Sequence, residues 1–433
     1  MSVSRSMHLA LVIGDVGFHQ AAWRLDGSHA DQLARLDVFK SIAQRAEQAN
    51  LDSLFVADVL GFDVASVESW PTNQLEPLTL LSALSAVTQK IGLIGTQSST
   101  FNEAYSIARQ FLSLDHLSNG RAGWNVVTSR SGQQHYGLEH LPSHDDRYER
   151  AEEVAIAVKK LWESWQPDAI VLNKHTGIYA TAEKIQEVEF NGQHIKLKGA
   201  LPSPRSIQNR PVIVQAGSSE EGRNFAAQHA DIVFTMQPSA SDAKAFYQDV
   251  KRRAVSFGRN ADDLKVFQGI TPFVAETIDE AVRIKNELDE LTDYTYALAR
   301  FQLIFKTLSV TIEQLNQGFT TKQLQQMQET EKSTTALKLY QLASSRATLK
   351  AVLNALVTAR GHWTPVGTII DISNQMQQRV NEYCTDGFII LPSDLHHGLN
   401  GFLDGIVPHL KRNHAFRDAY TGETLRAHLG LKY

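Results

Sequence analysis

The sequence alternates short, β-branched apolar segments with longer segments of helical periodicity, and this alternation constrains the fold more than any other feature. Neighbouring parallel strands must be joined by a crossover, so strand–helix alternation favours a parallel sheet. The apolar segments are continuous, which is typical of strands covered on both faces. The predicted strands are Leu9–Val16, Ser53–Asp58, Ile91–Ser98, Ala122–Ser129, Val212–Ser218, Ile232–Gln237, Val266–Val274 and Phe388–Leu391. Eight such units predict a (β/α)₈ barrel.

The main competing architecture is a doubly wound open sheet. It is disfavoured because no Gly-x-Gly-x-x-Gly follows the first predicted strand, where a dinucleotide-binding unit would carry that motif.

A bare barrel accounts for only part of the 433 residues, so we predict one domain over residues 1–433 with two insertions. Residues 167–210 contain the pair Asn191–Gly192 between two short apolar segments, which predicts a β-hairpin. Residues 277–385 have mostly helical character and predict a helical insertion before the last strand.

The charge and composition of the chain limit the classes of molecule that it is expected to bind. Lys and Arg number 42 against 47 Asp and Glu, and the net charge of −5 lacks the basic character of proteins that bind nucleic acid or anionic membranes. A single cysteine, Cys384, excludes an intrachain disulfide and a multi-cysteine metal site. Neither a signal peptide nor a membrane span is expected. We expect a cytoplasmic protein that acts on a small molecule and carries no metal.

Polar residues follow several predicted strands at the edge where a barrel active site lies. The candidates are Asp58, Thr96 to Ser99, Asn125 with Thr128 and Ser129, and Gly217 with Ser218 and Ser219. Only Asp58 among them is ionisable, whereas a hydrolase or an aldolase would be expected to place a lysine or a pair of carboxylates here. Such a set suits the binding of a large polar ligand while a cofactor supplies the reactive chemistry.

The segment from Gln215 to Arg223 indicates a strand, a tight turn and a helix start. Backbone N–H groups at that helix start, with Ser218, Ser219 and Arg223, could bind a phosphate group. The alternative needs no ligand, because Ser218-x-x-Glu221 also has the pattern of a capping box.

His144 and Tyr148 lie four residues apart at another predicted helix start, which puts them on one face of that helix. Their segment is rich in charged residues, so a solvated helix start is the alternative interpretation.

The segment Ser118–Ser129, with its core Gly123–Trp124–Asn125–Val126–Val127–Thr128, is more specific. It resembles the signature of the nitrilotriacetate, pristinamycin IIA and dibenzothiophene-sulfone monooxygenase group within the bacterial luciferase-like superfamily. Other segments resemble the same group in order, including Leu54–Asp58, His144–Glu153, Pro211–Ser219 and, in the tail, Phe416–Arg417, Tyr420–Gly422 and Thr424–Arg426. The resemblance extends over essentially the whole chain.

This resemblance implies a (β/α)₈ barrel that binds reduced FMN as FMNH₂ and uses O₂. By matching positions, the FMN contacts are expected at Asp58, Thr96, His144, Tyr148 and Ser219, with Ser218 and Arg223 near the phosphate and Asn125 near the ring. A separate NAD(P)H:flavin reductase is expected to supply FMNH₂ in a two-component system, and the group tends toward dimers and tetramers.

The implied activity is a monooxygenase reaction, in which a flavin C4a-(hydro)peroxide transfers one oxygen atom to a small organic compound that contains sulfur or nitrogen. His144 is the candidate catalytic residue, because histidine titrates near neutral pH and could stabilise the peroxide or carry a proton. Phe18, Trp23 and Trp70 could form an apolar substrate pocket, and Arg24 or Arg130 could bind a substrate anion, although each also fits ordinary loop packing.

Two alternatives remain open. The same barrel could use a deazaflavin or a flavin for hydride transfer without O₂, or the chain could be a non-catalytic flavin-binding relative.

Overall fold

The computed structural model describes residues 5–14, 16–32, 35–71, 75–330 and 333–432. Within them, eight parallel strands close a barrel in the order β1-β2-β3-β4-β9-β10-β11-β14. These strands are β1 (His8–Val12), β2 (Ser53–Val56), β3 (Gly92–Ser98), β4 (Ala122–Val127), β9 (Val212–Gln215), β10 (Ile232–Thr235), β11 (Lys265–Ile270) and β14 (Gly387–Ile390). Each overlaps one predicted strand, so the (β/α)₈ fold is confirmed. Position 15 of the first predicted strand and positions 331–332 of the predicted helical insertion lie outside the described residues.

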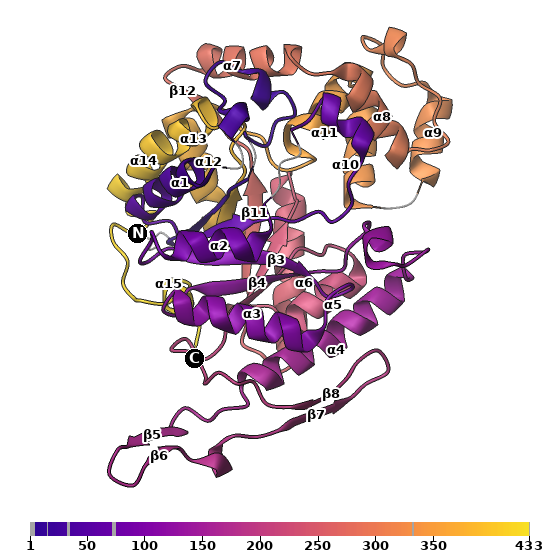
Figure 1. Cartoon of the computed structure of the whole chain (residues 1–433). Helices are drawn as coiled ribbons and strands as arrows, with labels where there is room; N and C mark the ends of the chain where they lie inside the picture. Colours follow the sequence, from indigo (N-terminus) through magenta and orange to yellow (C-terminus); the bar gives the residue numbers. More distant parts are fainter. Residues whose placement is uncertain (1–4, 15, 33–34, 72–74, 331–332, 433) are drawn as a thin grey trace.

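Helices surround the strands as the alternation predicts (Figure 1). The surrounding helices are α1 (Leu36–Gln48), α2 (Pro77–Ser85), α3 (Ala104–Leu117), α4 (His144–Trp162), α5 (Glu220–His229), α6 (Ala240–Ser256), α12 (Ile369–Asn381), α13 (His397–Asn400) and α14 (Val407–Arg412). No helix in the described part of the chain is long and apolar enough to cross a membrane.

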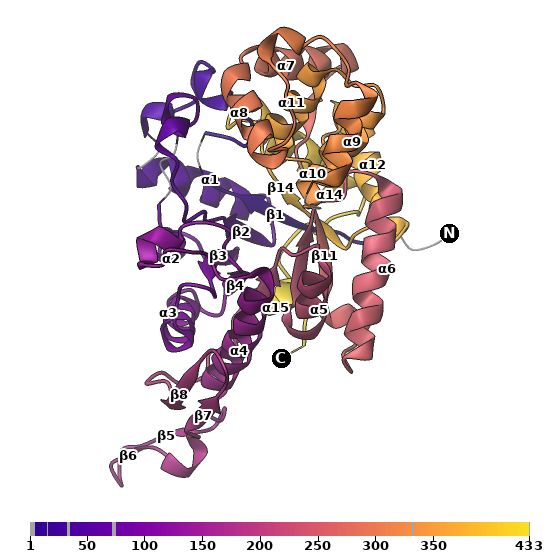
Figure 2. The same ribbon diagram turned by 90° about the vertical axis from the view of Figure 1, so that its right-hand side faces the viewer.

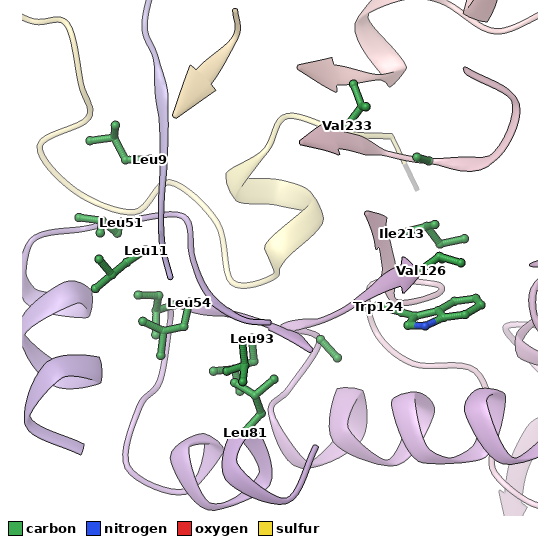
Figure 3. Packing of buried hydrophobic residues seen from close by; sticks show 14 of the residues in the cluster. Leu9, Leu11, Leu51, Leu54, Leu81, Leu93, Trp124, Val126, Ile213 and Val233 are labelled. Carbon is green, nitrogen blue, oxygen red and sulfur yellow. The ribbon is translucent and has the colours of Figure 1, made fainter. Parts of the chain in front are cut away.

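Apolar side chains fill the space between the strands and these helices. Leu9, Leu11 and Leu54 belong to this layer (Figure 3), whereas Ala10 between two of them belongs to the separate core inside the barrel. Trp124 on β4 packs against Phe111 of α3 and is edge-on to Trp162 of α4, with ring centroids 6.0 and 6.3 Å apart. Alternate residues of one strand therefore supply two cores, which explains the unbroken apolar segments.

The first half of the signature segment stabilises the fold. Arg121, just before β4, is almost fully buried, and its guanidinium donates hydrogen bonds to the last turn of α2 and to neighbouring loops. The acceptors are the carbonyl oxygens of Ser85, Thr88, Ile91 and Ser118 and the hydroxyl of Thr88. A buried guanidinium is tolerated only when its donors are paired. This arginine thus secures the amino end of the strand whose other end carries Asn125.

The hairpin insertion contains two hairpins where the sequence predicts one. The pair β7 (Val188–Asn191) and β8 (Lys196–Gly199) contains the predicted Asn191–Gly192 turn, with Gly192 N donating to Ile195 O at 2.9 Å. The carboxylate of Glu153 on α4 accepts three backbone N–H groups of this turn, at 2.7–3.0 Å. The other pair, β5 (Ile170–Asn173) and β6 (Ile178–Ala180), projects further from the barrel (Figure 2).

The helical insertion follows β11 and covers the opposite end of the barrel from the hairpins (Figures 1 and 2). Its helices are α7 (Ile278–Glu290), α8 (Tyr294–Ile304), α9 (Thr321–Glu329), α10 (Thr334–Ser344) and α11 (Leu349–Ala359). The last four share a hydrophobic core of their own around Phe301, Leu339 and Leu353. A parallel pair of short strands, β12 (Phe273–Ala275) and β13 (Val366–Thr368), joins the two ends of the insertion.

Candidate active site

The amino terminus of α5 forms one end of the candidate site. The Ser219 hydroxyl caps the helix by accepting the Gly222 N–H at 3.1 Å, and Ser218 before it is half-buried. A Cβ atom on Gly222 would lie 2.8 Å from the Gly217 Cα and 2.9 Å from the Tyr148 hydroxyl oxygen. Glycine is therefore required for the turn after β9 to lie against the helix. A capped helix start with a phenol beside it is a site where an anion binds favourably.

The start of α4 lies against this helix start. His144 and Tyr148 face each other with ring centroids 4.9 Å apart, as their spacing predicts. His144 Nδ1 lies 3.3 Å from Asp145 Oδ1 and 3.9 Å from Glu221 Oε2 in the first turn of α5, and its side chain is 47% exposed. The structure thus brings His144 and Tyr148 together with Ser219, on the rim of the barrel.

The guanidinium group of Arg223 forms ion pairs away from the candidate phosphate site. Its Nη1 pairs with Asp249 Oδ2 of α6 and its Nη2 with Glu220 Oε2, both at 2.8 Å. Two carboxylates therefore balance the positive charge of the guanidinium. The structure does not bring this side chain into contact with Ser218 or Ser219.

Thr96 and Asn125 lie side by side on neighbouring strands, β3 and β4, and both are buried. Asn125 Nδ2 donates to Thr96 Oγ1 at 2.9 Å, whereas Asn125 Oδ1 is buried with no hydrogen-bond partner among the described residues. A buried acceptor without a partner costs about 1–3 kcal/mol. A ligand in the mouth of the barrel that donates a hydrogen bond to Asn125 Oδ1 would remove this cost.

Asp58 stands just beyond β2 and is half-buried. Burial raises the pKa of its carboxyl group, and the negative charge of Glu76 raises it further. The carboxyl group of Asp58 is thus easier to protonate than an ordinary aspartate.

Sequence reasoning missed a histidine that the helical insertion brings to the barrel. His362 stacks on Phe234 of β10 with ring centroids 5.2 Å apart, and it packs on Gly269 of β11. Its Nδ1 is buried and finds no hydrogen-bond partner within the described chain. Burial lowers the pKa of His362 to about 3, and the charge of Arg360 adds to this, so the imidazole is neutral at pH 7. The only signal for this residue in the sequence is that Arg360 and His362 flank Gly361 at the end of the amphipathic segment that forms α11.

Further buried polar atoms lack partners in the described structure at the same end of the barrel. They are both amide atoms of Gln20 after β1, Thr235 Oγ1 at the end of β10, and Thr271 Oγ1 after β11. A native domain leaves few such atoms, and each requires an explanation. These four atoms lie near the carboxyl ends of the strands, where a ligand bound to the barrel could satisfy them.

An apolar cavity opens next to Asp58, at the ends of β1, β2 and β14. Phe18 and Trp70 line it, as predicted, together with Arg360. Trp23 does not line this cavity but donates from its indole to Ser69 O at 3.2 Å. Arg24 faces a separate surface groove along α7, where it donates to Leu291 O at 2.5 Å.

These residues fit a flavin mononucleotide. The helix start suits the phosphate, and the neutral side chains with partnerless buried atoms suit the polar edge of the ring system. The fold and the site together define a (β/α)₈-barrel enzyme with its ligand site at the carboxyl ends of the strands. Residues 16–382 match the sequence profile of the luciferase-like monooxygenases, and the chain belongs to this family.

Curated relatives agree with this assignment and confirm the resemblance inferred from the signature. N-acetyl-S-(2-succino)cysteine monooxygenase of Bacillus subtilis (strain 168) is 39% identical over 434 residues, covering 100% of this chain and 98% of that protein. Nitrilotriacetate monooxygenase component A of Aminobacter aminovorans is 37% identical over 445 residues, with 100% and 98% coverage. Dibenzothiophene-sulfone monooxygenase of Rhodococcus erythropolis (strain XP) is 33% identical over 454 residues, again with 100% and 98% coverage.

A solved structure extends the likeness to a flavin complex. The crystal structure of a riboflavin lyase with modified FMN and riboflavin matches with a TM-score of 0.86 at 28% identity, covering 99% of this chain and 96% of that one. The chain is thus a flavin-dependent oxidoreductase of the luciferase-like monooxygenase family.

Proposed function

We propose that this enzyme is the oxygenase component of a two-component monooxygenase. It takes FMNH₂ from a separate NAD(P)H:flavin reductase and transfers one oxygen atom of O₂ to a small organic compound that contains sulfur or nitrogen. The relatives named for a succinylated cysteine, which is a thioether, and for nitrilotriacetate, which is a tertiary amine, support this substrate class.

The buried Asn125 Oδ1 is the observation that carries the proposal. It lies beside Thr96, has a free acceptor within the described structure and stands at the mouth of the barrel. The ring of a reduced flavin carries N–H groups that would satisfy this acceptor. Binding would then remove the cost of an unpaired buried acceptor, so this pair would favour the ring in a fixed orientation.

The helix start would hold the other end of the cofactor. Ser218, Ser219 and Tyr148 would bind the phosphate, and Asp58 would accept hydrogen bonds from hydroxyl groups of the sugar alcohol. His144 contacts the first turn of α5, so its position favours a phosphate contact. The catalytic role suggested by its titration range stays a prediction, as does a phosphate contact for Arg223, whose charge two carboxylates already balance.

When bound, FMNH₂ supplies the two electrons with which one oxygen atom of O₂ enters the substrate and the other leaves as water. The protein's part is to orient the substrate and to keep bulk water away from the reacting atoms. The helical insertion covers the barrel end where this occurs, and neutral His362 would offer hydrogen bonds to the bound ligand there through Nδ1, which is unpartnered within the described residues.

The activity is tested by supplying chemically reduced FMN and ¹⁸O₂ to the purified protein with a thioether or amine acid. The proposal expects product with one ¹⁸O atom and a matching decrease in the H₂O₂ that free FMNH₂ forms with O₂. Reduction of the compound with no labelled oxygen in the product would instead support hydride transfer, and no product with any acid would support a non-catalytic relative.

The phosphate site is tested with two matched helix caps. Ser219 caps α5 and Ser239 caps α6 with the same geometry, each hydroxyl accepting an N–H at 3.1 Å. Ser219→Ala and Ser239→Ala should each lose about 1 kcal/mol of stability. Only Ser219→Ala should weaken FMNH₂ binding in an anaerobic titration. Equal affinities of the two variants would mean that Ser219 only caps its helix.

A further inference from the structure

Among the described residues, the cavity beside Asp58 combines an apolar interior with one guanidinium group. Side chains from several elements form the interior, among them Phe39 of α1, Leu80 of α2 and Leu395 after β14. Arg360 is the one charged residue among the described residues that line it. An apolar cavity with a single cation suits a ligand that has an apolar body and one negative group.

Aromatic rings hold the guanidinium of Arg360 in place. Its Cζ lies 4.6 Å from the ring centroid of Phe18 and 5.2 Å from that of Trp70. Stacking on an aromatic face uses the plane of the guanidinium and leaves its N–H groups pointing outward along the edge. The group has five N–H donors, so a contact elsewhere still leaves donors for a carboxylate.

Arg360 occupies a backbone position that glycine would fit with less strain. Arg360 follows α11 in the left-handed conformation with φ 51°, a position where glycine or asparagine is favoured. A long side chain in this conformation is uncommon and mildly costly.

We propose that Arg360 binds the carboxylate of an organic anion whose apolar part occupies this cavity. The enzyme would thus select amphiphilic carboxylic acids and discriminate against neutral compounds of the same shape. This inference rests on the proposed function, because it names the substrate class of the same site. The cavity adjoins Asp58, so the apolar body of the acid would lie next to the flavin.

The test uses (benzylthio)acetate and its neutral analogue 2-(benzylthio)acetamide as probes, with binding measured by calorimetry and turnover measured with chemically supplied FMNH₂. The wild type is expected to bind the acid about 10- to 100-fold more tightly than the amide. Arg360→Gly should abolish this preference by weakening the acid alone. Glycine suits the left-handed position, so the variant should fold.

Two further variants separate charge from geometry. Arg360→Lys keeps the charge but loses the planar fork, so it should retain only part of the preference. Arg24→Gln is the matched control, since Arg24 lies in a different groove, and it should keep the full preference.

A wild type without preference, or Arg360→Gly with the preference intact, would overturn the assignment of Arg360. Failure of the proposed function looks different: the acid would bind with the Arg360-dependent preference, yet no labelled oxygen would enter it. FMNH₂ affinity should be unchanged in Arg360→Gly, and a parallel loss would overturn the assignment in favour of a cofactor contact.

Discussion

Asp115 on α3 allows a quantitative test of how the amino end of β4 is held. Its side chain is fully buried, and its Oδ1 accepts the Ala122 N–H at 2.9 Å and the Gln208 side-chain N–H at 2.6 Å. A hydrogen bond from the side chain of Ser206 also favours the carboxylate form. Burial raises the pKa of this carboxyl group from 3.8 to about 6, because the hydrogen bonds only partly offset the loss of hydration.

A raised pKa in the folded state means that folding binds a proton. The stabilising contribution is therefore fully present below the unfolded pKa of 3.8 and is lost as the pH rises through about 6. A shift from 3.8 to about 6 corresponds to about 3 kcal/mol, at 1.36 kcal/mol for each unit. Above that range the buried carboxylate opposes folding by this amount.

Asp115→Asn keeps the acceptor oxygen and removes the charge. The free energy of unfolding of the variant minus that of the wild type should rise by about 3 kcal/mol between roughly pH 4 and pH 8. Denaturant titrations at several pH values measure this difference, and other titrating groups cancel in it. A difference that stays constant with pH would refute the reasoning.

Asp231 supplies a control of opposite sign. Burial opposes its ionisation too, but the charges of Arg426 and Arg210 outweigh burial and lower its pKa, with Arg426 Nη2 2.8 Å from Asp231 Oδ2. Its contribution is present above the unfolded pKa and is lost as the pH falls through the lower folded pKa. Asp231→Asn should therefore destabilise the protein more at neutral pH than in acid.

Three further predictions concern the flavin site. Asn125→Leu should weaken FMNH₂ binding about tenfold in an anaerobic titration, while the free energy of unfolding of the apoprotein falls by less than about 1 kcal/mol, because the asparagine has an unpaired acceptor. Unchanged affinity would mean that Asn125 does not contact the flavin ring. Glu76→Gln should lower the raised pKa of Asp58, so the loss of FMNH₂ affinity at acidic pH should move to lower pH. An unchanged pH dependence of the affinity would mean that Asp58 does not take part in binding. Gly222→Ala should reduce FMNH₂ affinity more than Ser219→Ala does, because its Cβ would lie 2.8 Å from a backbone carbon, and equal losses would contradict the packing argument.

The strands were predictable because each signals its place locally. Interactions between residues close in the sequence determine the continuous apolar segments, the Asn191–Gly192 turn and the serine helix caps. The geometry of the barrel then determines where the polar residues at the strand ends lie. Thr96 and Asn125 therefore lie together as expected. The hairpin β5–β6 was missed because its strands are short and mostly exposed, with the irregular Leu172 at φ 48°, so no buried face imposes a pattern.

Other features depend on contacts between distant segments, which a single sequence does not reveal. Arg223 has the spacing of a phosphate ligand, but Asp249, from the next helix, draws its guanidinium away. Arg360 and His362 reach the barrel mouth through the path of the helical insertion rather than through a strand end. The insertion was predicted as a block of helices, while the direction of its return to the barrel follows from tertiary packing.

The short parallel pair β12–β13 has a consequence for how such enzymes diversify. It holds the two ends of the helical insertion in register, with Ala275 paired to Thr368, while helices α8–α11 have a hydrophobic core separate from that of the barrel. The segment between these strands thus enters and leaves the barrel at one place, and a replacement from a relative would also have to keep its contacts with the barrel, such as Lys338 with Asp242 and His362 with Phe234. Because Arg360 and His362 lie between these strands and Thr96, Asn125 and Ser219 do not, we expect such an exchange to alter the proposed substrate cavity more than the proposed flavin site.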